Sequence, residues 1–168
     1  MLAAAGKSVL QHLSYGRIIG AAGAEPVGFA TGTCETILFA RRGLAFALVD
    51  EEIYELYAGH RLMVPRGKPV QVYADGPGCE LIEISAPAEG ESAVRLIEGQ
   101  GADEGLALRS WVGEVDSADD LSERIVVLLE GLANAETTLN TDDCLLIPQR
   151  AALGASGGMR GFWVSAKT

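Results

Sequence analysis

Residues 59–70, with the sequence GHRLMVPRGKPV, decide how the chain is expected to fold. A glycine opens the stretch, a short aliphatic run follows, and a proline and a second glycine close it. Gly59 permits a tight turn into a strand, Pro65 suits a strand end where no ladder donor is needed, and Gly67 lets the chain reverse. The stretch therefore predicts a short β-strand, Arg61–Val64, between two turns.

Short runs of aliphatic and β-branched residues recur on both sides of this stretch, separated by glycine, proline and acidic residues. That pattern is typical of strands joined by turns, and its regular spacing without long helices predicts an all-β sandwich or barrel. A weak, short N-terminal helix is expected within residues 1–16. Turns are expected at Arg42–Gly43 and Asp75–Gly78. The expected strands are Arg17–Ala21, Val27–Ala30, Glu35–Arg41, Leu44–Val49, Glu52–Tyr57, Arg61–Val64, Val70–Ala74, Glu80–Ser85, Leu106–Val112, Arg124–Leu129, Leu132–Ala135, Glu136–Leu139, Cys144–Ile147 and Phe162–Ser165.

Three short matches in the same order indicate an internal repeat. Seven residues separate Glu35 from Gly43, and seven separate Glu123 from Gly131. The sequence LMVP at 62–65 matches LLIP at 145–148, and ISA at 84–86 matches VSA at 164–166. We therefore expect an N-terminal segment (1–16), a first barrel (17–88), a linker (89–105) and a shorter second half (106–168).

The stretch from Gly59 resembles the second conserved motif of the cupin superfamily, G-x5-P-x-G-x2-H-x3-N, with both glycines and the proline in frame. Residues Glu35 to Gly43 are similar to the end of the first motif, H-x-H-x3-4-E-x6-G, with one extra residue before the glycine. Together with the repeat, the resemblance covers residues 17–168. It implies the double-stranded β-helix, or jelly-roll barrel, of RmlC-like proteins in two repeats. The chain would then be a bicupin, or a cupin with a degenerate second half, that forms a homodimer.

The same resemblance implies a metal site of three histidines and one glutamate, which suits Mn, Fe, Ni or Zn. The chain has only two histidines, His12 and His60, and neither falls at a ligand position. The first histidine pair is replaced by Gly28 and Ala30, or with the other spacing by Phe29 and Thr31, and Val70 replaces the third histidine. In the second copy the corresponding positions hold Asp116 and Ala118, or Ser117 and Asp119, and Leu153. We therefore expect no bound transition metal, no cofactor and none of the family's usual redox chemistry.

A ligand pocket is predicted inside the first barrel. If Glu35 faces inward, period-two alternation places Phe39 and Arg41 on the same side, and the later strand contributes Val70 and Val72. Such a pocket is mainly apolar and suits a small organic ligand. The alternative is that Glu35 is a strand-edge residue that faces water or pairs with Arg41 or Arg42. The candidate pocket residues are Gly28, Ala30, Glu35, Phe39, Arg41, His60, Val70 and Val72.

Two functions follow from these residues. One is a metal-free module that binds a small molecule or has a structural role. The other is a metal-independent sugar or sugar-phosphate isomerase or epimerase, in which Glu35, His60 or one of the tyrosines Tyr54, Tyr57 and Tyr73 transfers a proton. An enzyme needs at least two titratable groups that converge in one pocket, whereas a binding barrel can be closed by aliphatic side chains. The sequence assigns no catalytic residue.

Composition excludes several partners. The 168 residues include 13 Lys and Arg against 23 Asp and Glu, a net charge of −10, and an acidic surface repels nucleic acid and anionic membranes. The three cysteines, Cys34, Cys79 and Cys144, form no CxxC pair, which fits a reducing compartment. No signal peptide or apolar run long enough for a membrane span is recognisable. We therefore expect a cytoplasmic protein.

Overall fold

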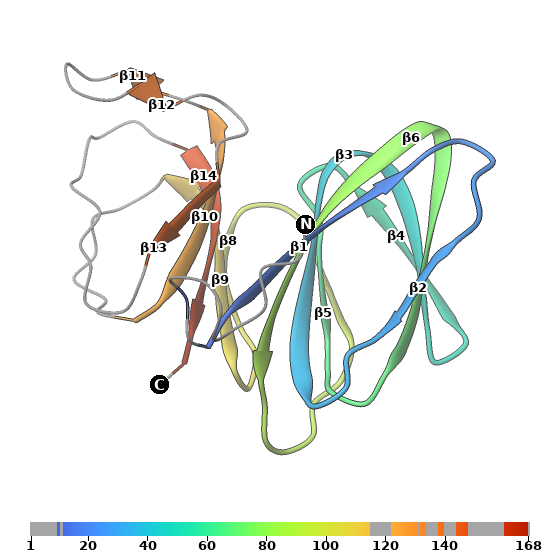
Figure 1. Ribbon diagram of the computed structural model, residues 1–168, viewed down its shortest axis with the longest axis horizontal. Coiled ribbons are helices and arrows are strands. Elements are labelled where there is room, and N and C mark those ends of the chain that lie inside the picture. The colour runs from blue at the N-terminus through green and yellow to red at the C-terminus, as the bar shows by residue number, and fades with distance from the viewer. Residues whose placement is uncertain are drawn as a thin grey trace.

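The computed structural model describes residues 10, 12–114, 122–130, 132–133, 138–139, 144–147 and 160–167, which contain strands and no helix. The strands are β1 (Ser14–Gly20), β2 (Val27–Ala30), β3 (Cys34–Val49), β4 (Glu52–Tyr57), β5 (Arg61–Val64), β6 (Pro69–Pro87), β7 (Arg95–Ile97), β8 (Gly101–Glu104), β9 (Leu108–Glu114), β10 (Arg124–Glu130), β11 (Leu132–Ala133), β12 (Thr138–Leu139), β13 (Cys144–Ile147) and β14 (Arg160–Ala166). Two large antiparallel sheets, one of seven strands and one of five, lie side by side in Figure 1, and β11 and β12 form a two-stranded third sheet.

The seven-stranded sheet encloses its own hydrophobic core. Along β3, Leu38, Ala40, Ala45 and Ala47 are buried in this core, together with aliphatic side chains from β1, β4, β5 and β6. The cluster consists of Ile18, Leu38, Ala40, Ala45, Ala47, Val49, Leu56, Leu62, Val64, Val70, Val72, Cys79 and Leu81. The inside of the first barrel is therefore lined mainly by aliphatic side chains.

A second core joins the two sheets. Ile37 and Phe39, on the opposite face of β3, pack with Phe162 and Val164 of β14 and with Ile125 and Val127 of β10. The rings of Phe39 and Phe162 stack with their centres 4.2 Å apart and their planes 17° from parallel. Because both faces of β3 are buried, its first half is a continuous hydrophobic run rather than an alternating one.

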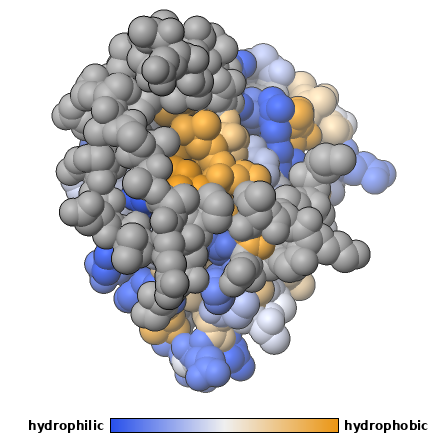
Figure 2. Space-filling model, turned by 60° about the vertical axis from the view of Figure 1, so that its left-hand side comes forward, coloured by the Kyte–Doolittle hydropathy of each residue, from blue (hydrophilic) through white to orange (hydrophobic). Residues whose placement is uncertain are grey.

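The far face of β10 is apolar as well. Val126 and Leu128 are buried there, at 2% and 0% exposure. Figure 2 shows hydrophobic side chains gathered on the side of the molecule that carries the second sheet. The strand β10 thus resembles β3 in having two apolar faces.

The predicted repeat is present in the pairing of the strands. The order β5-β3-β6-β1 in the first sheet recurs as β13-β10-β14-β9 in the second. Thr36 pairs with Val64 as Arg124 pairs with Ile147, and Ile37 pairs with Ile84 as Ile125 pairs with Val164. The three sequence matches therefore occupy equivalent places in the two sheets.

Two expected turns do not interrupt the strands. β3 continues through Arg42 and Gly43, and β6 continues through Asp75–Gly78, with register shifts where the extra residues are accommodated. Positive φ angles at Gly43 (72°), Gly76 (59°) and Gly78 (123°) let the chain bulge while pairing goes on. The glycines that suggested turns are thus bulge residues in long strands.

The first sheet extends beyond residues 17–88 at both ends. Residues 1–9 and 11, on which most of the expected N-terminal helix falls, lie outside the described residues, and residues 14–16 belong to β1. The segment expected as a linker contributes β7 to the first sheet, beside β5, and β8 to the second, beside β9. No helix in the described part of the chain is long and apolar enough to cross a membrane.

Candidate functional site

The eight predicted pocket residues lie on three different surfaces. Val70 and Val72 face the core of the first barrel. Phe39 faces the second sheet, as does Glu35. Gly28 and Ala30 are exposed, because Phe29 between them packs against the barrel core. The structure therefore does not bring the predicted residues together in one pocket.

Glu35 is fully buried, but outside the barrel. Its carboxylate accepts hydrogen bonds from the backbone N–H groups of Leu106 (2.9 Å), Ala107 (2.8 Å) and Leu108 (3.0 Å), where the chain enters β9. Gly105 lies against the same carboxylate, and a Cβ at that position would collide with it. Both carboxylate oxygens are thus held by the second half of the chain, which corrects the expectation of an inward or water-facing Glu35.

Glu123 makes the reciprocal contact. It is 1% exposed, and its carboxylate accepts the N–H groups of His12 (2.6 Å) and Leu13 (2.7 Å), where the chain enters β1. His12–Leu13 and Ala107–Leu108 are equivalent in the repeat, because Ser14 pairs with Ser85 as Arg109 pairs with Ser165. Each half therefore holds the first residues of the other half's β1-type strand through one buried glutamate.

Arg41 and His60 are also away from the barrel interior. The Arg41 guanidinium, 7% exposed, contacts Glu80 at 2.6 Å, and Arg17 contacts the same carboxylate oxygen at 2.7 Å. His60 lies in the turn before β5, with its ring edge-on to Tyr57 at a centre distance of 5.4 Å, and its Nδ1 atom is buried without a hydrogen-bond partner in the described structure. Neither side chain is placed beside Glu35.

The three tyrosines proposed for proton transfer each donate a hydrogen bond along their own strand. Tyr54 donates to Glu52 (2.6 Å), Tyr57 to Glu55 (2.9 Å) and Tyr73 to the Gln71 side chain (2.7 Å). The bond to Glu52 is the main cause that raises the pKa of Tyr54 to about 12. The hydrogen bond to Glu55 likewise raises the pKa of Tyr57, so the Tyr54 and Tyr57 phenols are poor proton donors near neutral pH.

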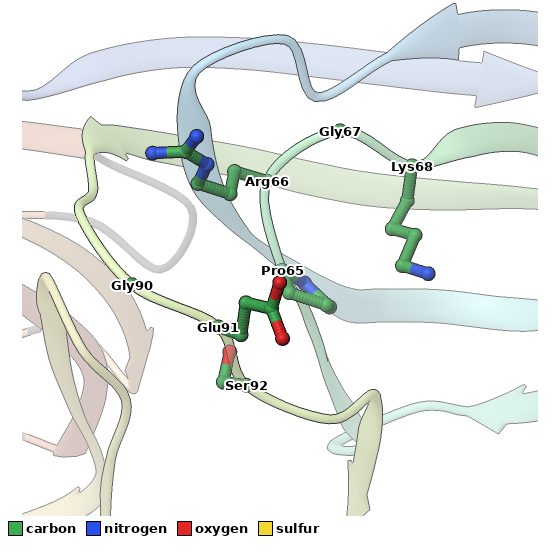
Figure 3. Close-up of a pocket in the computed structure, with 7 residues that line it drawn as sticks. All are labelled: Pro65, Arg66, Gly67, Lys68, Gly90, Glu91 and Ser92. Atoms are coloured by element: carbon green, nitrogen blue, oxygen red, sulfur yellow. The ribbon is translucent and has the colours of Figure 1, made fainter.

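An open cleft lies at one end of the first barrel, where the motif residues Pro65 and Gly67 form the turn between β5 and β6. The cleft holds about 540 Å³ between residues 65–68 and Gly90–Ser92. In Figure 3 the carboxylate of Glu91 points into the space between the turn and Lys68, and Arg66 extends to the side of Gly90. Arg66 donates to the Ala88 carbonyl at 3.2 Å, and Lys68 forms an ion pair with Asp50.

The hydroxyl of Ser92 is the least satisfied polar group of this cleft. Its oxygen is buried and has no hydrogen-bond partner in the described structure. A smaller cavity of about 260 Å³, lined by residues that include Tyr54, Asp50 and Val94, shares Lys68 and Ser92 with the cleft. The two spaces together present cationic and anionic groups to a molecule bound there, and the buried Ser92 hydroxyl lies in their shared wall.

Comparison with known proteins shows similarity of structure without similarity of sequence. No family model matches the chain, and no curated protein is significantly similar to it. The E. coli protein YlbA, of family DUF861, superposes with a TM-score of 0.75 at 12% identity, over 99% of this chain and 81% of its own. AerE from Microcystis aeruginosa gives 0.72 at 11% identity, over 94% and 89%. A variant of salicylate 1,2-dioxygenase from Pseudoaminobacter salicylatoxidans gives 0.66 at 11%, over 95% and 72%. The chain has the cupin fold.

The fold corrects the alignment of the first cupin motif. In the motif six residues separate the glutamate from the glycine, and counting back from Gly43 reaches Thr36, not Glu35. Thr36 is 1% exposed and its hydroxyl lies 2.9 Å from that of Ser85, on the barrel side of β3. Ser85 in turn hydrogen-bonds the carboxylate of Glu83, whose pKa burial raises above its ordinary value. Thr36, Ser85 and Glu83 form the polar cluster of the cupin barrel.

The residues at the other cupin ligand positions do not fit a metal. With the longer spacing and Thr36 as reference, the histidine positions hold Phe29 and Thr31, and Val70 stands at the third. Phe29 pairs with Val70 in the β2–β6 ladder and both pack in the barrel core, while the Thr31 hydroxyl donates to the Pro65 carbonyl at 2.8 Å. Within the described residues, no three side chains of His, Cys, Asp or Glu come together as a ligand set. The side chains at these positions therefore supply no ligand set through which a metal could act.

Sequence reasoning missed two polar groups of the structure. Glu83 was treated only as part of a strand. It lies two residues from both Leu81 and Ser85, however, so it shares their face of β6, which is the barrel side. Arg61 is fully buried between the sheets, where it donates to the Gly101 carbonyl (3.1 Å), the Ser110 hydroxyl (3.0 Å) and the Gly99 carbonyl (3.4 Å). Burial lowers the pKa of this guanidinium, and the charge of Asp103 acts in the opposite direction. The only sequence signal for this contact is the glycines at positions 99 and 101, which favour a close approach of the backbone to another group.

Proposed function

We propose that this protein is a metal-free, cupin-fold binding module, and that a small polar organic molecule binds in the cleft between residues 65–68 and 90–92. The observation that carries the proposal is the cleft itself, with an unpartnered buried Ser92 hydroxyl and the Glu91 carboxylate pointing into it. A buried polar group without a partner is costly, so a ligand that hydrogen-bonds Ser92 gains affinity. The repeated strand pairing further supports a bicupin with a shortened second half.

The absence of metal chemistry is part of the same proposal. The four cupin ligand positions of the first half hold Phe29, Thr31, Thr36 and Val70, which offer two hydroxyls and no imidazole or carboxylate. Both hydroxyls are hydrogen-bonded to protein groups. Divalent transition metals prefer imidazole, thiolate or carboxylate ligands, so this set is a poor one.

The cleft suits a hydroxylated ligand. Arg66 and Lys68 provide cations on one wall, and Glu91 and Ser92 provide an acceptor and a hydroxyl on the other. Sugars, sugar phosphates and small hydroxy acids combine several hydroxyls with at most a small negative charge, and match this mixture. The volume of the cleft lies within the range of small-molecule sites.

A thermal-shift screen tests the proposal directly, with D-glucose, D-glucose 6-phosphate and glycolate as probes. A ligand present at 100 times its dissociation constant stabilises the folded state by about 2.7 kcal/mol, which raises the Tm by roughly 5–11 °C for a chain of this size. Glu91→Gln should reduce the shift, whereas the matched change Glu98→Gln, at an exposed residue outside the cleft, should not. No shift with any probe, or an equal shift in both variants, would count against binding in the cleft.

The isomerase or epimerase alternative is supported by one observation, the polar cluster inside the barrel. Glu83 is partly buried, its pKa is raised by burial, and Ser85 and Thr36 form a hydrogen-bonded pair beside it. A carboxyl with a raised pKa can act as an acid or base closer to neutral pH. Proton exchange at C2 of D-glucose 6-phosphate in D₂O, followed by NMR and abolished by Glu83→Gln, would favour the enzyme. No exchange above the uncatalysed rate favours the binding module.

A further inference from the structure

A further hollow lies on the outer face of the first barrel, on the opposite side of the sheet from the barrel core. Its floor is formed by Phe46 and Leu48 of β3, with Ile53 and Glu55 of β4 on one side and Tyr73 of β6 on the other, and it holds about 640 Å³. The strand register explains this arrangement, since Phe46 pairs with both Glu55 and Tyr73. We call this hollow, together with its continuation along β3, the outer groove.

The outer groove continues along β3. A neighbouring hollow of about 390 Å³ shares Leu48 and is lined also by Asp50, Glu51, Pro69 and Gln71. Gln71 pairs with Leu48, so it belongs to the same face of the sheet as Tyr73. The two hollows therefore form one groove across the three strands β4, β3 and β6.

The outer groove is unusually apolar for a surface exposed in a single chain. Ile53 is 67% exposed and Tyr73 is 36% exposed, and beside them Tyr57 is 50% exposed. Contiguous exposed apolar side chains mark interaction sites more often than isolated ones do. The two aromatic rings, Phe46 and Tyr73, are positioned on adjacent strands for contact with a flat or extended apolar group.

The charged side chains that line the outer groove are all acidic. Its lining includes the carboxylates of Glu55, Asp50 and Glu51, and in the described part of the chain no lysine or arginine lines it. Lys68 pairs with Asp50 at one end only. Glu55, in the middle, receives a hydrogen bond from the Tyr57 hydroxyl at 2.9 Å, and it pairs with Phe46 in the β3–β4 ladder.

We propose that the outer groove binds a small organic cation, meaning an ammonium or guanidinium group on an apolar or aromatic body. The cation would lie at the Glu55 carboxylate, and the apolar body would lie on Phe46, Leu48 and Tyr73. Aromatic faces and carboxylates both attract organic cations, and the carboxylate at the middle of the groove meets no lysine or arginine among its described lining residues. The proposal concerns the outer face of the sheet, which meets the cleft at residues 65–68 at the Lys68–Asp50 ion pair, and it does not depend on the function proposed for that cleft.

A second copy of the chain fits this face less well. A two-fold contact through the outer groove brings the same patch against itself, which places Glu55, Asp50 and Glu51 of one copy in the same interface as those of the other. Like charges facing each other across an interface are costly, and the chain already carries a net charge of −10. A molecule of opposite charge relieves this repulsion.

Two probes with the same body and opposite charge test the proposal: 4-phenylbutylamine and 4-phenylbutyrate. Titration of the isotope-labelled protein by NMR should show the amine binding at least about fivefold more tightly than the acid, and more weakly as salt is added. Chemical-shift changes should be centred on Phe46, Glu55 and Tyr73. Equal affinity of the two probes, tighter binding of the acid, or no binding of the amine overturns the proposal.

Variants separate the charge from the apolar surface. Glu55→Gln should remove the preference for the amine while leaving the fold intact, because Glu55 is exposed, and Glu98→Gln should leave the preference unchanged. Light scattering at several protein concentrations, with and without Ile53→Lys, tests the competing occupant. A stable wild-type dimer that Ile53→Lys dissociates would mean that a second copy covers the groove, and would overturn the proposal.

Discussion

The strongest prediction concerns the substitution Glu35→Gln. The Glu35 side chain is 0% exposed, and its two carboxylate oxygens accept three backbone N–H groups, at 2.9, 2.8 and 3.0 Å. Glutamine has nearly the same shape but only one acceptor oxygen. Whichever way the amide turns, its NH₂ group meets at least one N–H of Leu106, Ala107 or Leu108, and that donor is left without an acceptor.

The size of the effect follows from these bonds. A hydrogen bond to a charged group is worth about 1.5–3 kcal/mol, and a buried N–H without a partner costs about 1–3 kcal/mol. We expect Glu35→Gln to lower the free energy of unfolding by about 2–4 kcal/mol, which corresponds to a fall in Tm of roughly 4–16 °C. Glu35→Ala, which leaves all three N–H groups unpaired, should cost about 4–6 kcal/mol, a large part of the stability of an ordinary domain.

Equilibrium unfolding in urea, followed by circular dichroism, measures these losses. Glu123→Gln should lose less, because the His12 and Leu13 N–H groups both donate to the same carboxylate oxygen, Oε2, whose place the glutamine carbonyl can take. The exposed Glu98→Gln should stay within about 0.5 kcal/mol of the wild type. Amide hydrogen exchange at Ala107 and Leu108 should accelerate in Glu35→Gln. A Glu35→Gln variant as stable as Glu98→Gln would refute the claim that the buried carboxylate holds the two halves together.

Three further predictions concern the barrel, the metal and the bulges. Because burial raises the pKa of Glu83 above 4.5, the folded chain keeps a proton that the unfolded chain releases, and stability falls as pH rises through this window. Glu83→Gln should therefore gain stability relative to wild type as pH rises above 4.5, and a pH-independent difference in urea unfolding would contradict this. Elemental analysis of the purified protein should find far less than one Mn, Fe, Ni or Zn per chain, and a stoichiometric amount would show that the ligand positions were misread. Gly43→Ala should lower the free energy of unfolding by about 3 kcal/mol or more, since its Cβ collides with the Gly78 carbonyl. Gly59→Ala lies in open space at a φ of 95° and should lower it by about 1–2 kcal/mol. Equal losses of the two variants in thermal unfolding would contradict this reasoning.

Much of the fold was predictable because it depends on residues that are close together in the sequence. The strand β5 and its flanking turns follow from Gly59, Pro65 and Gly67, whose backbone requirements do not depend on distant contacts. The repeat was recognisable for a similar reason, since equivalent strands keep equivalent patterns even without a common ligand set. The bulges at Gly43 and Gly78 were predicted as turns, because a glycine with a positive φ occurs both in turns and in β-bulges. Only the continued pairing of β3 with β6 shows that these glycines belong to bulges.

The candidate site was predictable only in part. The sequence shows that no histidine falls at a ligand position. The alignment of the first motif, however, was off by one residue, because it put Glu35 instead of Thr36 at the glutamate position, which faces the barrel. Adjacent residues of a strand point to opposite faces, so that single step moved the carboxylate from the barrel to the junction between the sheets. The cleft at residues 65–68 and the outer groove were not predictable, because their walls come from segments far apart in the chain.

By itself, the sequence determined the all-β class, the repeat, the acidic charge and the lack of histidine at the cupin ligand positions. These properties depend on residue type and on spacing along the chain. The tertiary structure decided which face each side chain occupies and what it meets there. Because both faces of β3 are apolar, the alternation of residues along this strand could not show which face lies inside the barrel. Only the packing of the second sheet against Ile37 and Phe39 shows that this face, with Glu35 on it, lies outside the barrel.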